Sequence, residues 1–272
     1  MFNTKSKKEI SEEDLLILTQ AKQQMDDIGW AMKGLNKVGN VIQNKIDLLP
    51  EKQLNKLQKI SYDILLKVVN ANLLSMKADK ITNQPINNAY KAMVTTSGVL
   101  GGTFGMIAFT ADLTLTTKIM MRSIMDIARS QGEDITDLDT QLACLQVFAL
   151  GGKSKHDDNL DTGYYATRIT LNSTMKGATA GAGKITSTLL KSSSNPIIQV
   201  LGAIASRFSV QVSEKFVAQA IPILGAAGGG AINLAFMNHF QSMAQAHFSI
   251  RRLERKYDEK TVKKVFDKIV LY

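Results

Sequence analysis

The chain has 272 residues, a net charge of +9, four prolines and 6 % aromatic residues. This length allows one large domain or two small ones, and the many Leu, Ile, Met, Ala, Lys and Gln residues favour helix over strand. The single cysteine, Cys144, excludes an internal disulfide and is typical of a reducing compartment.

The first 85 residues predict an amino-terminal helical hairpin. Ser11–Asp14 resembles a capping box, and the apolar periodicity behind it predicts a helix. Pro50 is well placed for the first turn of a second helix. Asn83-Gln84-Pro85 indicates a break, after which we expect a separate helical domain over residues 86–272.

Two uncharged, glycine-rich apolar segments occupy residues 92–111 and 216–238. Glycine weakens a helix by about 1 kcal/mol relative to alanine, so such clusters indicate a close approach of another helix, a lipid or a ligand. Gly101 and Gly105 are one pair with the spacing of close helix packing. Both segments reach the length of a membrane span, but their polar residues favour burial or shallow insertion instead.

The remaining sequence alternates between helical patterns and breaks. The breaks are at residues 132–134, 151–163 and 192–196, and no alternating strand pattern is present. The sequence therefore predicts an all-α, multi-helix bundle with glycine-rich, closely packed central hairpins.

Asp112 and Arg122 are the first candidate functional residues. Asp112 follows the first glycine-rich segment and is interpreted either as a helix N-cap or as a buried carboxylate at the base of a pocket. Ten helical residues place Arg122 about 15 Å further along. Arg122 is positioned either to pair with Asp126 on the surface or to bind a phosphate or carboxylate.

The two histidines of the carboxyl-terminal helical pattern do not predict a metal site. His239 and His247 are eight residues apart with no ligand between them at helical spacing, and His247 falls on an apolar stripe as a core histidine. Residues 177–186 resemble a phosphate-binding loop but lack its first glycine and its Ser or Thr. We expect no metal, no cofactor and no nucleic-acid partner.

Several segments together resemble the EcsC family of bacterial proteins. They lie at residues 101–128, 132–134, 142–151 and 221–257, in that order, within a match over roughly residues 90–270. The resemblance implies a bacterial helical protein whose polar residues border glycine-rich apolar runs, and it implies no established chemistry. It places the family signature on Asp112, Arg122, Gly225, Asn233, His239, His247, Phe248, Arg251 and Glu254.

The leading functional hypothesis is a non-enzymatic peripheral membrane or lipid-associated protein in the cytoplasm. Its partner would be anionic lipid, because basic residues such as Arg122 and Arg251 border the apolar segments. The expected ligand-binding residues are Gly101, Gly105, Asp112, Arg122, Asn233, His239, His247 and Arg251.

Two alternatives stay open at the level of sequence. One is an enzyme in which Asp112 is the acid or base and Arg122 or His239 is its partner. The other is a structural adaptor of a membrane complex, whose polar residues stabilise the bundle. Arg251 with Glu254, three residues apart, is a candidate stabilising pair.

Overall fold

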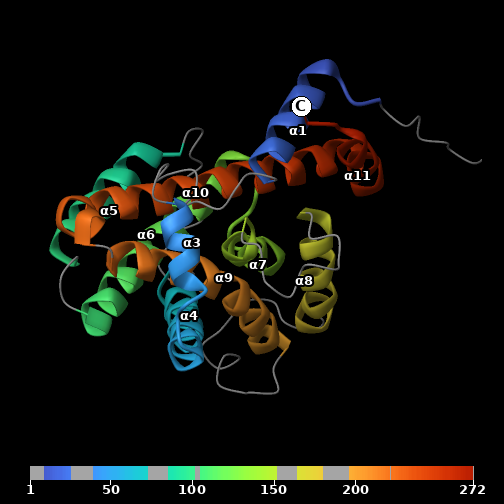
Figure 1. Ribbon diagram of the computed structural model, residues 1–272. Helices are drawn as coiled ribbons and strands as arrows, with labels where there is room; N and C mark the ends of the chain where they lie inside the picture. The colour runs from blue at the N-terminus through green and yellow to red at the C-terminus, as the bar shows by residue number, and fades with distance from the viewer. Residues whose placement is uncertain are drawn as a thin grey trace, which may run out of the picture.

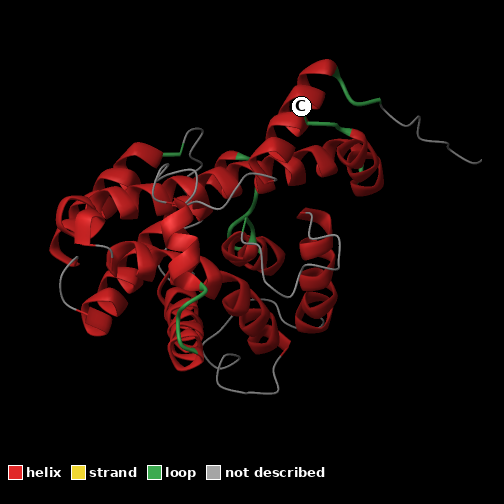
Figure 2. Ribbon diagram, in the orientation of Figure 1, coloured by secondary structure: helices red, strands yellow, loops and turns green. Residues whose placement is uncertain are grey.

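The computed structural model describes residues 9–25, 39–72, 85–101, 105–151, 164–179, 196–220 and 222–271. These residues form α-helices, one 3₁₀ turn and no strand (Figure 2), which confirms the all-α prediction. In chain order the elements are α1 (Glu12–Met25), α3 (Gly39–Ile46), α4 (Glu51–Asn72), α5 (Asn87–Gly101), α6 (Gly105–Ser130), α7 (Leu138–Gln146), the 3₁₀ turn η2 (Val147–Ala149), α8 (Tyr164–Thr179), α9 (Pro196–Ala220), α10 (Pro222–Tyr257) and α11 (Glu259–Lys268).

The 36-residue helix α10 is the axis of the molecule. It crosses the view in Figure 1, with α5 and α6 along its first part and α1 and α11 beside its carboxyl end. The helix α9 packs on α10, α4 and α8. At 1.5 Å per residue α10 is about 54 Å long, so its two ends serve different parts of the protein.

Both glycine-rich segments span a junction between two helices. The first, 92–111, runs from α5 into α6, and the second, 216–238, runs from α9 into α10. In each case the two helices pack against one another, which confirms the predicted glycine-rich hairpins. None of the described helices combines the length and the apolar character needed to cross a membrane.

Helix ends follow the expected local chemistry. The Oγ of Ser11 accepts a hydrogen bond from the backbone N–H of Asp14, so it caps α1. At the end of α6, Gly132 adopts a positive φ of 81°, and the N–H of Glu133 reaches the carbonyl of Ala128 at 3.1 Å. This arrangement ends α6 at the predicted stop. Pro50 directly precedes α4, and α5 begins two residues after Pro85.

Helices on both sides of residue 85 contribute to one hydrophobic cluster. Leu18 of α1 and Leu57 and Leu65 of α4 belong to the same buried cluster as Leu113 of α6 and Phe236 of α10. The predicted domain boundary at residue 85 stays a prediction. The predicted loop at 151–163 lies outside the described residues except for Gly151, and the break at 192–196 except for Pro196.

At Gly230, α10 lies close to the backbone of α5. A Cβ atom at this position would lie 2.8 Å from the carbonyl oxygen of Thr95 and 3.2 Å from its Cγ2. Two residues earlier on α10, a Cβ at Gly228 would meet no atom within 4 Å. Packing therefore requires glycine at position 230, whereas it does not require glycine at position 228.

This difference predicts opposite effects of alanine at two neighbouring positions. Gly228→Ala should raise the free energy of unfolding by about 0.5–1 kcal/mol, because alanine favours the helix. Gly230→Ala should lower it by about 1–2 kcal/mol, because the backbone carbonyl of Thr95 cannot yield cheaply and overpacking exceeds the propensity gain. Urea unfolding of both variants measures the difference. Equal stabilisation by both changes would contradict the close approach of α5 and α10.

Candidate functional site

Asp112 is a buried carboxylate inside α6, so its interpretation as a helix N-cap is wrong. The ammonium of Lys215 lies 2.8 Å from its Oδ2, and the side-chain amide of Gln219 donates to the same oxygen at 3.1 Å. The amide of Asn233 donates to Oδ1 at 2.8 Å, and the hydroxyl of Thr116 lies 3.4 Å from it. We call Asp112, Lys215, Gln219 and Asn233 the hairpin junction.

The hairpin junction joins the two glycine-rich hairpins. Asp112 comes from α6, Lys215 from α9 and Asn233 from α10. The amide of Asn233 also donates to the carbonyl of Val94 on α5, at 3.1 Å. All four hairpin helices therefore contact one polar cluster. The Lys215 side chain is 0 % exposed and that of Asp112 is 3 % exposed.

Burial and charge act in opposite directions on the Asp112–Lys215 pair. Burial alone would raise the pKa of the Asp112 carboxyl, but the ammonium of Lys215 and the amides of Asn233 and Gln219 outweigh it and hold that pKa below its ordinary value. Burial lowers the pKa of Lys215, and its carboxylate partner offsets part of this effect. The carboxylate oxygens of Asp112 are engaged by protein donors, and this arrangement suits the positioning of helices better than proton transfer to a substrate.

Arg122 lies apart from the hairpin junction. Its side chain is exposed and forms no hydrogen bond or ion pair with another described residue. Asp126 instead lies 3.6 Å from the guanidinium of Arg129 and accepts the backbone N–H of Ile86, so of the two alternatives for Arg122 the pair with Asp126 is wrong. Because both residues belong to one continuous helix, Arg122 is about 15 Å along α6 from Asp112.

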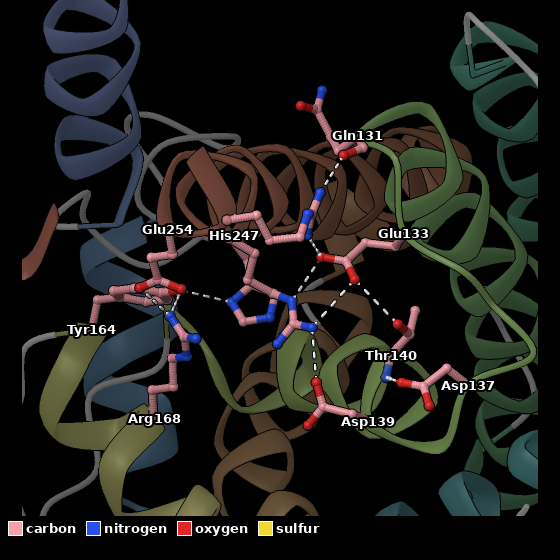
Figure 3. Close-up of polar contacts among 11 residues, drawn as sticks. Gln131, Glu133, Asp137, Asp139, Thr140, Tyr164, Arg168, His247 and Glu254 are labelled. Atoms are coloured by element: carbon pink, nitrogen blue, oxygen red, sulfur yellow. Dashed lines mark hydrogen bonds and ion pairs between the residues drawn. The ribbon is translucent and has the colours of Figure 1, made fainter. Parts of the chain in front are cut away.

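A second polar region surrounds the carboxyl half of α10 and contains two clusters (Figure 3). In the Glu133 cluster, Glu133 accepts from Arg251 at 2.8 and 3.2 Å, contacts Arg255, and accepts from the hydroxyl of Thr140 at 3.1 Å. Arg251 also donates to Asp139 at 2.9 Å. Burial would raise the pKa of the Glu133 carboxyl, but its hydrogen bond and charge contacts with Arg251 and Arg255 lower it overall.

In the Glu254 cluster, the same oxygen of Glu254 accepts from Arg168 of α8 at 2.6 Å and from the hydroxyl of Tyr165 at 3.0 Å. Arg168 also donates to the Tyr164 hydroxyl oxygen, which lies 2.9 Å from Nδ1 of His247. Burial raises the pKa of Tyr164 to about 12. The predicted Arg251–Glu254 pair is wrong, because each residue pairs with a partner on another helix.

His247 is fully buried, as predicted from its place on an apolar stripe. Its Nε2 has no hydrogen-bond partner among the described residues. Burial, followed by the charges of Arg168 and Arg251, lowers the pKa of His247 well below its ordinary value. The imidazole is therefore neutral in the folded protein at neutral pH.

The remaining candidate residues have local roles. His239 is half-buried against Gly151, whose φ is +71° and where a Cβ would lie 2.5 Å from the imidazole Cε1. Gly101 ends α5, and Gly105 begins α6 with a φ of +70°, so the expected packing pair of these two glycines on one helix is wrong. The structure thus brings Asp112 and Asn233 together. It places His247 and Arg251 in the second polar region, and the described contacts do not join His239 or Arg122 to Asp112.

Sequence reasoning missed Lys215 and Arg168, and it treated Glu133 only as part of a helix stop. The available signal was weak. Lys215 stands near Val212, Val217 and Ala218, which are buried in the same helix, so a charge at that position already required a buried partner. Nothing in the local sequence identified that partner as a residue 103 positions away.

Comparison with known protein families shows which family this chain belongs to. The sequence matches the EcsC protein family over residues 3–253. The chain belongs to the EcsC family. The matched region includes α1, α3 and α4, which lie before the resemblance expected over roughly residues 90–270, so the EcsC match extends over both sides of the expected boundary at residue 85. No curated protein and no solved structure matches this EcsC chain.

Proposed function

We propose that this EcsC-family protein is a peripheral, non-enzymatic membrane-binding protein that contacts anionic lipid through the α5–α6 hairpin. The observation that carries the proposal is an exposed stripe along α6, which we call the α6 stripe. It consists of Ile107, Ala111, Leu115, Lys118 and Arg122, all exposed and spaced by three or four residues.

The α6 stripe changes from apolar to basic with distance from the hairpin turn. Ile107, near the turn, is 89 % exposed, and Leu115 is 47 % exposed. Eight helical residues separate them, which corresponds to about 12 Å along the axis. If the hairpin enters the membrane with its turn first, this length is measured along the direction of insertion. It is then comparable with the depth of about 5–10 Å to which amphipathic helices enter the boundary between headgroups and acyl chains.

The sequence around the hairpin turn supports the same orientation. No residue from Ala92 to Ala111 is charged, and Met93 on α5 is 53 % exposed. An uncharged hairpin end with exposed apolar side chains is costly in water and favourable at a lipid interface. The basic residues follow one turn further along α6, where lipid phosphates would lie.

Arg122 supplies the charge complementarity for anionic headgroups, because it is exposed and forms no hydrogen bond or ion pair with another described residue. Each basic residue near such a surface contributes about 1 kcal/mol, and the net charge of +9 favours the approach to the membrane. Arg251 is no longer expected to bind lipid headgroups, because its guanidinium is paired with Glu133 and Asp139. The enzymatic alternative gains no support, because the carboxylate of Asp112 is enclosed by protein donors.

Flotation with phosphatidylglycerol-containing and pure phosphatidylcholine vesicles tests the proposal. The protein should float with the anionic vesicles, and high salt should weaken this binding because the basic residues are exposed. Ile107→Glu should reduce the bound fraction about tenfold, because it places a negative charge at the apolar end of the stripe.

Leu48→Glu is the matched control, because Leu48 is 80 % exposed and lies between α3 and α4, outside the α5–α6 hairpin. This control should bind vesicles as the unchanged protein does. Loss of flotation in both variants, or in neither, would contradict the role of the hairpin. No binding of the unchanged protein to any vesicle would favour the structural adaptor instead.

A further inference from the structure

A cavity of about 260 Å³ lies between α1, the residue after α6 and the carboxyl part of α10. It is separate from the proposed membrane contact, since Ser249 in this cavity is 19 helical residues, or about 28 Å, along α10 from Gly230 beside α5. We propose that this cavity binds a small sugar phosphate, a hydroxyl-bearing phosphate monoester.

The charge of the lining predicts an anion. Among the described residues that line the cavity, Arg252 is the one charged side chain and none is a carboxylate. Arg252 is exposed and forms no hydrogen bond or ion pair with another described residue. Its neighbours Arg251 and Arg255 both bind Glu133, so Arg252 is the guanidinium left for a ligand. A guanidinium presents paired donors that fit phosphate oxygens.

The helical register of α10 adds a second donor beside Arg252. Gln245, Ser249 and Arg252 are spaced by four and three residues, so they share one face that lines the cavity. The oxygen of Ser249 accepts a weak contact from the Gln245 amide at 3.4 Å, and its own proton has no acceptor among the described residues. Ser249 can therefore donate to the same phosphate as Arg252.

The other residues of the cavity wall fit the sugar part of the ligand, which carries hydroxyl groups. The described part of the wall includes four glutamine side chains, and the buried Oε1 of Gln131 has no hydrogen-bond partner within the described chain. A carboxamide both donates and accepts, which matches hydroxyl groups. Ile17, Ala21 and Ala246 provide an apolar surface for the C–H groups of a sugar ring. The volume is below that of common drug-sized pockets, about 300–1,000 Å³, which favours a monosaccharide over a nucleotide.

Calorimetric titration of the full chain with glucose 6-phosphate tests this assignment, with glucose, inorganic phosphate and gluconate as comparison probes. Glucose 6-phosphate should bind at least about tenfold more tightly than each of the other three. Arg252→Gln should weaken its binding by about tenfold or more, because the phosphate loses its charged partner.

Gln24→Glu is a second variant that keeps the size and helix propensity of the side chain while placing a negative charge in the wall. It should also abolish binding of glucose 6-phosphate. Lys264→Gln is the matched control, since it removes one exposed positive charge on α11 outside the cavity, and it should leave binding unchanged.

Three results would overturn the proposal. These are no heat of binding with glucose 6-phosphate, equal binding of glucose 6-phosphate and inorganic phosphate, or tighter binding of gluconate. Equal losses in Arg252→Gln and Lys264→Gln would likewise place any bound anion outside the cavity. Thermal melts of all variants confirm that they fold. Vesicle flotation without sugar phosphate tests the proposed membrane function by itself. A failure of sugar-phosphate binding can therefore be told apart from a failure of membrane binding.

Discussion

Lys215→Met should lower the free energy of unfolding by about 3–5 kcal/mol, the range observed when one partner of a buried ion pair is removed. The reason is that the carboxylate of Asp112, whose side chain is 3 % exposed, would lose its counter-charge without gaining water. The amides of Gln219 and Asn233 would remain, but these neutral donors offset only part of the cost of the buried charge. Chemical denaturation of the purified variant measures this loss.

A double variant separates the ion pair from general packing effects. Lys215→Met combined with Asp112→Asn removes both charges, so its loss should be smaller than the sum of the two single losses. Lys264→Met on the exposed face of α11 is the control and should change stability by less than about 0.5 kcal/mol. A loss below about 1 kcal/mol for Lys215→Met, or strict additivity in the double variant, would contradict a buried pair.

The position of this pair explains why charges occur inside otherwise apolar hairpins. Glycine and alanine surfaces pack closely but are alike along their length, so they fix the register of two hairpins weakly. One carboxylate that meets donors from α9 and α10 at the same time favours the register that keeps both contacts. The hairpin junction thus sets the arrangement that places the α6 stripe on the outer face of α6.

Much of the helical framework could be predicted because its signals are local. Apolar periodicity, the Ser11 cap and the Gly132 stop each act within a few residues, and the structure confirms all three. The N-cap alternative for Asp112 fails for a local reason as well. An N-cap at Asp112 requires the uncharged run to precede the helix, whereas α6 begins inside that run at Gly105, whose positive φ marks the turn.

The partners of the buried charges could not be predicted in this way. Local rules recognise ion pairs three or four residues apart, and they suggested Arg122 with Asp126 and Arg251 with Glu254. The structure instead joins Arg168 to Glu254 across 86 positions and Arg251 to Glu133 across 118. Burial decides these pairings, because a charge removed from water needs the partner that the tertiary fold supplies.

The free energy of unfolding should decline in mild acid because His247 is buried in its neutral form. Its folded-state pKa is held well below the ordinary value by burial and by the charges of Arg168 and Arg251. In the unfolded chain the imidazole titrates near its ordinary pKa of about 6.5. Below that pH the unfolded state binds a proton that the folded state does not, so stability falls as pH falls. The expected loss between pH 7 and pH 5 is about 2 kcal/mol.

The difference in unfolding free energy between pH 7 and pH 5 is the quantity to measure, for the unchanged protein and for His247→Gln. The variant should lose most of this difference, whatever its absolute stability, because glutamine does not titrate. Both proteins should still weaken further below about pH 5. There the carboxyls of Asp14, Asp112 and Glu133, whose folded-state pKa values are lowered, remain ionised only in the folded state. Their stabilisation is complete above the ordinary carboxyl pKa and is lost as pH falls through the lowered values. An unchanged pH 7 to 5 difference in His247→Gln would mean that another group carries the mild-acid dependence and that His247 is not held neutral by its surroundings.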